Sequence, residues 1–67
     1  MAIYFFKVTS KDTRGFLTGS IKKETIRTND EFDEVCKEIT EGALPTFKKD
    51  NENYTINDLL VETLNRL

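Results

Sequence analysis

Histidine and tryptophan are absent from this 67-residue sequence, which also has only one cysteine and one proline. Without histidine, neither a Ser-His-Asp triad nor a Cys-His pair can form, and the common zinc-binding patterns are excluded. One cysteine cannot form a disulfide within the chain, and an unpaired Cys36 is typical of a reducing compartment. We therefore expect a cytoplasmic protein that holds no metal and no cofactor.

Long hydrophobic runs are missing as well. No segment approaches the roughly 18 apolar residues of a membrane-spanning helix. Residues 1–6 have neither the basic segment nor the small-residue cleavage site of a signal peptide. The three glycines, Gly15, Gly19 and Gly42, are too far apart for a phosphate-binding loop or a dinucleotide fingerprint. These absences argue against a membrane partner and against a nucleotide ligand.

The length of the chain limits what it can do. A domain of about 60 residues buries only about 60% of the surface that its unfolded chain exposes. A pocket that encloses a substrate is therefore hard to build, and without one nothing raises a carboxylate pKa toward neutrality. Five phenylalanines and two tyrosines, with charges of both signs, nevertheless favour an ordered chain. We predict one domain over residues 1–67 and no enzymatic activity.

The N-terminal part of the chain has the pattern of a β-hairpin. Residues 2–9 are rich in aromatic and β-branched side chains on both faces, which is typical of a central strand. Residues 10–15 supply turn chemistry, and residues 16–27 predict a longer second strand. Gly19 interrupts this strand, and an interior glycine often marks a β-bulge, which would bring Phe16 and Ile21 to one face.

The next segment predicts a helix over residues 29–41. Thr28 and Glu31 have the spacing of a capping box. Behind them, apolar side chains recur at the i, i+3, i+4 and i+7 spacing of an amphipathic helix; these are Phe32, Val35, Cys36 and Ile39. Gly42 and then Pro45 are the usual signals for the end of a helix.

The remaining residues predict a second helix. Residues 44–47 can form a short third strand, and residues 48–53 a polar turn. Thr55 is placed to cap a helix that continues to the C-terminus, with Asp58 at its third position. The predicted fold class is therefore α+β: an N-terminal antiparallel hairpin packed against two helices, in the order β-β-α-(β)-α.

This fold predicts a core and an apolar surplus. The predicted core consists of Tyr4, Phe6, Val8, Phe16, Ile21, Phe32, Val35, Cys36, Ile39, Phe47, Leu59, Leu60 and Leu64. Ile3, Phe5, Val61 and Leu67 remain outside it. A small core supplies little stability, and association is one way to bury more apolar area. We therefore predict that part of this surplus is covered in a homodimer.

Charge is segregated along the sequence. Residues 1–27 carry six basic and two acidic side chains, whereas residues 28–67 carry four basic and ten acidic ones. Three interpretations are open. In the first, the two halves attract each other within the fold, and acidic groups at a helix N-terminus are favourable in themselves. In the second, the hairpin binds nucleic acid through Lys11, Arg14, Lys22 and Lys23. In the third, the acidic helix binds a protein with a basic surface.

The third interpretation is the one we favour. Nucleic-acid-binding domains tend to be basic overall, whereas this chain has a net charge of −2. We expect a small regulatory or inhibitor protein, of a type frequent in phages and mobile elements, that binds a larger protein. The predicted recognition face consists of Asp30, Asp33, Glu34, Glu38 and Glu41. Nucleic-acid binding by the hairpin 7–27 is the alternative.

Overall fold

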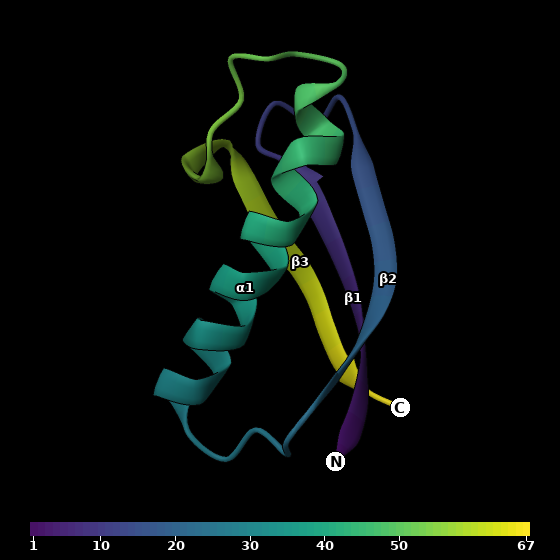
Figure 1. Ribbon diagram of the computed structural model, residues 1–67, viewed down its shortest axis with the longest axis vertical. Helices are drawn as coiled ribbons and strands as arrows, with labels where there is room; N and C mark the ends of the chain where they lie inside the picture. The colour runs from purple at the N-terminus through teal and green to yellow at the C-terminus, as the bar shows by residue number, and fades with distance from the viewer.

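The computed structural model describes residues 1–67 and contains a three-stranded antiparallel sheet with one α-helix (Figure 1). The elements in chain order are β1 (Ala2–Ser10), β2 (Phe16–Lys23), α1 (Asn29–Lys48), the 3₁₀ helix η1 (Ile56–Asp58) and β3 (Leu59–Arg66). The strand order is β2-β1-β3. The α+β class is thus confirmed, but the second helix is absent. Neither helix has the length and apolar character that a membrane crossing requires.

β1 is the central strand, as its composition predicts. It pairs with β2 on one side and with β3 on the other, antiparallel in both cases. Tyr4 and Val8 are buried on the face that carries α1, whereas Ile3 and Phe5 lie on the opposite, open face. The chain has one α-helix, so only the first of these faces has a helical cover (Figure 1).

The β1–β2 hairpin is confirmed, but the bulge predicted at Gly19 is wrong. The register runs without interruption from Ala2↔Lys23 to Thr9↔Phe16, and Gly19 lies opposite Phe6. A Cβ atom at position 19 would lie 2.8 Å from Cζ of Phe6, so the missing side chain makes room for this ring. β2 ends at Lys23 rather than at residue 27, and the chain then turns toward α1.

α1 begins where the sequence predicts and continues past its predicted end. Thr28 Oγ1 accepts the N–H of Glu31 at 3.1 Å, and Glu31 Oε2 accepts the N–H of Arg27 at 3.2 Å. The helix extends to Lys48, so the predicted stop at residue 42 and the strand over residues 44–47 are wrong. Burial of Phe47 against the sheet favours the longer helix.

Pro45 lies inside α1 on its solvent-exposed side. A proline in a helix removes one hydrogen bond to the carbonyl four residues earlier. That residue is Glu41, which is also exposed. Water can hydrogen-bond the carbonyl that the proline leaves without a helical donor, which lowers the cost of continuing the helix past this position.

The predicted second helix is replaced by η1 and β3. Asp58 Oδ2 accepts the N–H of Thr55 at 2.8 Å, so the local cap forms, but it opens only a single 3₁₀ turn. Residues 59–66 instead pair with β1, which gives the backbone groups on the second edge of this strand hydrogen-bond partners. A register shift next to Val8 leaves Glu62 as the extra residue. This bulge keeps Val61 and Leu64 both packed against the core.

The core lies between α1 and the sheet. It consists of Val8, Val35, Ile39, Ala43, Phe47, Tyr54 and Leu59. Three predicted core residues are instead exposed: Phe16 (68%) in β2, Leu60 (52%) in β3 and Phe32 (42%) in the first turn of α1. Ala43 and Tyr54 were not predicted. The homodimer predicted from the apolar surplus stays a prediction; Ile3 and Leu67 of that surplus are exposed.

A polar network joins the β1–β2 turn to the loop after α1. Ser10 is buried, and its Oγ accepts the N–H groups of Arg14 and Gly15, each at 3.2 Å. Asp12 accepts the N–H of Arg14 at 3.1 Å and the hydroxyl of Tyr54 at 2.7 Å. The Tyr54 ring meets Phe47 edge-on, with centroids 6.1 Å apart. This network fixes the chain between α1 and β3 to the hairpin.

Substitution of Gly19 by alanine is expected to lower the melting temperature. The added methyl group would approach the Phe6 ring more closely than van der Waals contact allows, and overpacking of this kind typically costs about 1–3 kcal/mol. Thermal unfolding of Gly19→Ala, Phe6→Leu and the double variant measures the effect. The penalty for Gly19→Ala should shrink in the Phe6→Leu background; an equal penalty in both backgrounds would show that the ring is not the cause.

Acid is expected to weaken the Asp12–Tyr54 connection. Hydrogen bonds from Ser10 and then from Tyr54 hold the pKa of the Asp12 carboxyl below its usual value. The ionised carboxylate therefore stabilises the fold above a pH of about 4, and this stability is lost as the pH falls through the lowered pKa. The hydrogen bond to Asp12 raises the pKa of Tyr54, so its contribution is lost only above a pH of about 10.

Melting temperatures of the natural chain and of Asp12→Asn and Tyr54→Phe, measured between pH 2 and pH 7, test this expectation. Both substitutions should lower the melting temperature at pH 7, and the Asp12→Asn curve should converge with that of the natural chain in acid. Parallel curves over the whole range would rule out a role for this carboxylate.

Candidate protein-binding surface

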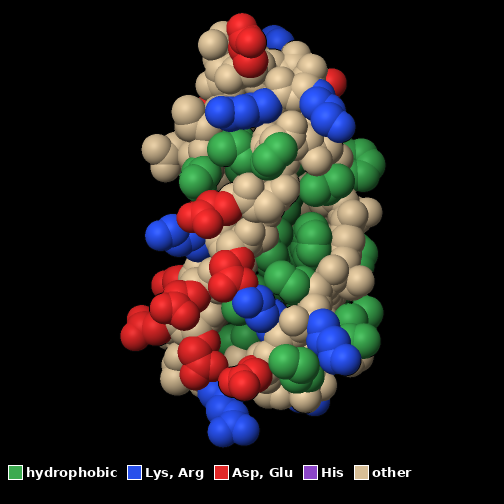
Figure 2. Space-filling model, viewed as in Figure 1, with side chains coloured by type: hydrophobic (Ala, Val, Ile, Leu, Met, Phe, Trp, Pro, Cys, Tyr) green, Lys and Arg blue, Asp and Glu red, His purple; other side chains and the backbone are tan.

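The predicted recognition face lies on the solvent side of α1. Its five carboxylate residues, Asp30, Asp33, Glu34, Glu38 and Glu41, are all exposed. Their spacing places them along one side of the helix, opposite the buried Val35, Ile39 and Ala43. Figure 2 shows acidic side chains gathered along this helix. The structure thus brings the five predicted residues together on one rigid element, which we call the acidic face.

Ion pairing within the chain involves only one of these carboxylates. Glu38 pairs with Lys23 of β2, and the other ion pair in the structure joins Lys7 to Glu62 at 3.7 Å. Lys37 falls on the same side of α1 by its spacing but forms no ion pair. Exposed pairs such as Lys23–Glu38 contribute at most about 1 kcal/mol. The acidic face therefore keeps most of its negative charge toward solvent.

The basic residues of the alternative interpretation lie at two ends of β2. Lys11 and Arg14 belong to the turn before this strand, whereas Lys22 and Lys23 are its last two residues. At about 3.3 Å per residue, the two groups are separated by roughly 25 Å. Lys22 lies on the open face of the sheet, whereas Lys23 lies on the helix side, where it pairs with Glu38. The four side chains do not form one compact patch.

A groove between α1 and β2 was not predicted from the sequence. It has a volume of about 270 Å³ and a mainly apolar lining of Phe6, Leu17, Ser20, Ile21, Glu38, Ile39, Gly42 and Ala43. Figure 2 shows hydrophobic side chains between the helix and the strand on this side of the molecule. The only hint in the sequence is Gly42, which was interpreted as a helix end and instead lies inside α1.

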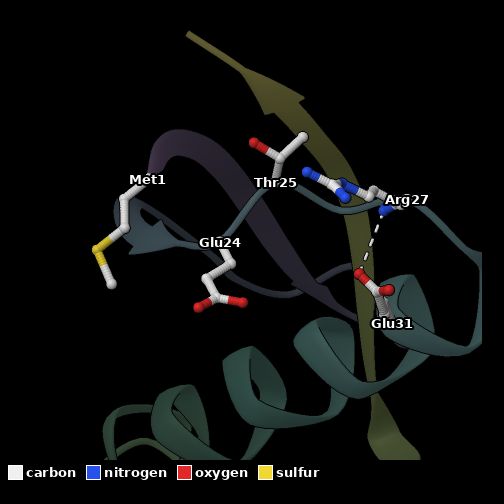
Figure 3. Close-up of a pocket in the computed structure, with 5 residues that line it drawn as sticks. All are labelled: Met1, Glu24, Thr25, Arg27 and Glu31. Atoms are coloured by element: carbon white, nitrogen blue, oxygen red, sulfur yellow. Dashed lines mark hydrogen bonds between the residues drawn. The ribbon is translucent and has the colours of Figure 1, made fainter.

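A second hollow, of about 410 Å³, lies where the N-terminus meets the segment between β2 and α1 (Figure 3). Its lining residues are Met1, Glu24, Thr25, Arg27 and Glu31. Glu31 accepts the backbone N–H of Arg27 and thereby serves the cap of α1. The lining mixes charges of both signs, and no group of three potential metal ligands occurs in the structure. The residues around this hollow therefore serve the start of α1, and their arrangement does not point to a ligand.

Cys36 does not have the surroundings of a catalytic thiol. It is half-buried on α1, and burial, followed by the negative charge of Asp33, raises its pKa above the usual value. A nucleophilic cysteine needs the opposite shift, since the thiolate is the reactive form. Every buried side-chain nitrogen and oxygen also has a hydrogen-bond partner, so no unsatisfied buried side-chain atom points to a ligand.

No protein-family model, curated protein or solved structure matches this chain.

Alkylation of Cys36 by iodoacetamide at neutral pH is expected to be slower than that of free cysteine. Burial and Asp33 both disfavour the thiolate, so removal of the charge in Asp33→Asn should accelerate the reaction slightly. Mass spectrometry of the intact chain follows the rate, with glutathione as the reference thiol. A rate above that of the reference would contradict the structural role assigned to this residue.

Proposed function

We propose that this chain is a small non-enzymatic regulatory or inhibitor protein, which acts by binding a larger protein through the acidic face of α1. One observation carries the proposal. Four of the five carboxylates, those of Asp30, Asp33, Glu34 and Glu41, form no ion pair within the chain, although residues 1–27 carry six basic side chains. Ion pairs within the chain therefore leave most of the negative charge of the acidic face without a partner.

The rigidity of the acidic face supports this proposal. Its residues lie on a 20-residue helix whose opposite side is fixed by the core. A partner therefore meets carboxylates in a preset arrangement, which reduces the entropy lost on binding. Negative potential along the helix also speeds the encounter with a basic surface and excludes acidic ones. Covering a basic functional surface of a larger protein is how such a chain would inhibit it.

One observation favours nucleic-acid binding as a second candidate. Phe16 is 68% exposed on the open face of the sheet, and Nζ of Lys7 lies 5.3 Å from the centre of its ring. An exposed aromatic ring beside a cation suits stacking of a base next to a phosphate. However, the separation of Lys11 and Arg14 from Lys22 and Lys23 weakens this candidate, because their charges do not reinforce one another.

Charge reversal on the acidic face tests the proposal. The immobilised chain is exposed to a lysate of its native host, and the captured material is identified by mass spectrometry. We expect Glu34→Lys/Glu41→Lys to lose the captured protein with little change in melting temperature, since neither carboxylate is paired within the fold. Asp50→Lys/Glu52→Lys is the matched control: it changes the net charge equally, at exposed positions after α1.

Two results would contradict the proposal. One is capture that the charge reversal on α1 leaves unchanged. The other is captured material that nuclease treatment releases and that falls steeply as salt is raised, which would favour the hairpin and nucleic acid instead.

A further inference from the structure

The groove between α1 and β2 exists because one helix cannot cover three strands. A helix with its side chains is about 10 Å wide, whereas neighbouring strands are about 4.8 Å apart, so one helix covers about two strands. α1 packs mainly on β3 and β1 (Figure 1). Leu17 and Ile21 of β2, with Phe6 of β1, are therefore only half-buried beside the helix. One strand of the three, about 5 Å of the sheet, is therefore left without helical cover, and a further helix placed there would rest on β2 and extend past the edge of the sheet.

Gly42 lies on the helix side of this groove and has no explanation within the chain. A glycine inside a helix is destabilising relative to alanine. At Gly19 the reason for glycine is the Phe6 ring, but a Cβ atom at Gly42 would meet nothing within 4 Å. Together with Ala43, Gly42 presents a patch without long side chains next to the apolar floor. A partner backbone can approach this patch closely.

The charges around the groove indicate the chemistry of its occupant. Glu38 lines the groove and pairs with Lys23 of β2, whereas Glu34 and Glu41, on the neighbouring side of α1, form no ion pair within the chain. A second copy of the chain, docked helix against helix, would bring the same carboxylates together and be repelled. A segment with basic residues along one flank would instead neutralise them.

We propose that the groove binds an amphipathic α-helix of the partner protein, one that carries lysine or arginine along the flank facing α1. The apolar face of this helix packs on Leu17, Ile21 and Phe6, and its backbone passes over Gly42. Docking completes a two-helix layer on the sheet, in the helix-in-groove mode of recognition. The proposal rests on the proposed function, since it identifies what the acidic face and the adjoining groove bind together.

A synthetic peptide is the probe for this groove. It has about 14 residues, roughly four helical turns, with leucine on one face and lysine along the flanks of that face. A peptide of the same composition in scrambled order and a leucine–glutamate peptide are the controls. Titration of the ¹⁵N-labelled full chain, followed by NMR, locates the contact residue by residue. We expect the amphipathic lysine peptide to shift signals of residues 17–21 and 38–43 and the two control peptides to leave them in place.

Substitutions in the chain separate the groove from the rest of the surface. Gly42→Leu fills the patch from open space and should keep the fold, which its melting temperature checks. It should lower the affinity for the lysine peptide by about tenfold or more, and Leu17→Ser should do the same. Leu60→Ser is the matched control, because it removes an exposed leucine from β3, at the other edge of the sheet from β2, and should leave the affinity unchanged.

Several results would overturn the assignment of the groove. If the scrambled peptide binds as tightly as the amphipathic lysine peptide, charge alone attracts them both. If Gly42→Leu binds the lysine peptide with unchanged affinity, the peptide contacts another part of the surface. Self-association of the chain through residues 17–21 would make a second copy the occupant. If host-protein capture is lost in Glu34→Lys/Glu41→Lys but kept in Gly42→Leu, the proposed function stands and the groove assignment falls. If host-protein capture is lost in Gly42→Leu alone, the groove assignment stands and the role of the acidic face is contradicted.

Discussion

The central position of β1 is the constraint on which the rest of the structure depends. This strand is apolar on both faces and needs hydrogen-bond partners on both edges. The hairpin supplies one edge, so the C-terminal segment has to supply the other and cannot remain a helix. With that segment used as β3, only α1 is left to cover the sheet. One face is therefore open, and the helix side is covered over β3 and β1 but not fully over β2.

Local signals in the sequence predict the elements that local interactions determine. The hairpin and the start of α1 are correct, because turn residues and the Thr28–Glu31 cap act within a few positions. The errors begin where distant contacts decide. Phe47, fixed by Tyr54 and the core, extends α1 past Pro45. Residues 59–66 have apolar spacing that suits a helix or a strand, and only the unpaired edge of β1 decides between them.

The two parts of the proposed binding surface differ in the same way. The acidic face follows from residue spacing on one helix, so its five carboxylates could be predicted to lie together. The groove depends on what α1 leaves uncovered, and no spacing within one segment contains that information. Gly42 is the residue of the groove that stands out in the sequence, but the pattern predicts a helix end there, whereas α1 continues to Lys48. The homodimer is predicted because apolar side chains remain outside the core expected for a hairpin and two helices.

Amide hydrogen exchange, measured residue by residue by NMR, tests most directly whether β1 is the central strand of the sheet and β2 an open edge. In the isolated chain, amides of β1 should exchange slowest, because both edges of this strand are paired. Amides of β2 that point away from β1 should exchange fast, since no strand covers them. If those β2 amides were as protected as the amides of β1, a further strand would cover this edge in solution, and the account of a three-stranded sheet centred on β1 would be contradicted.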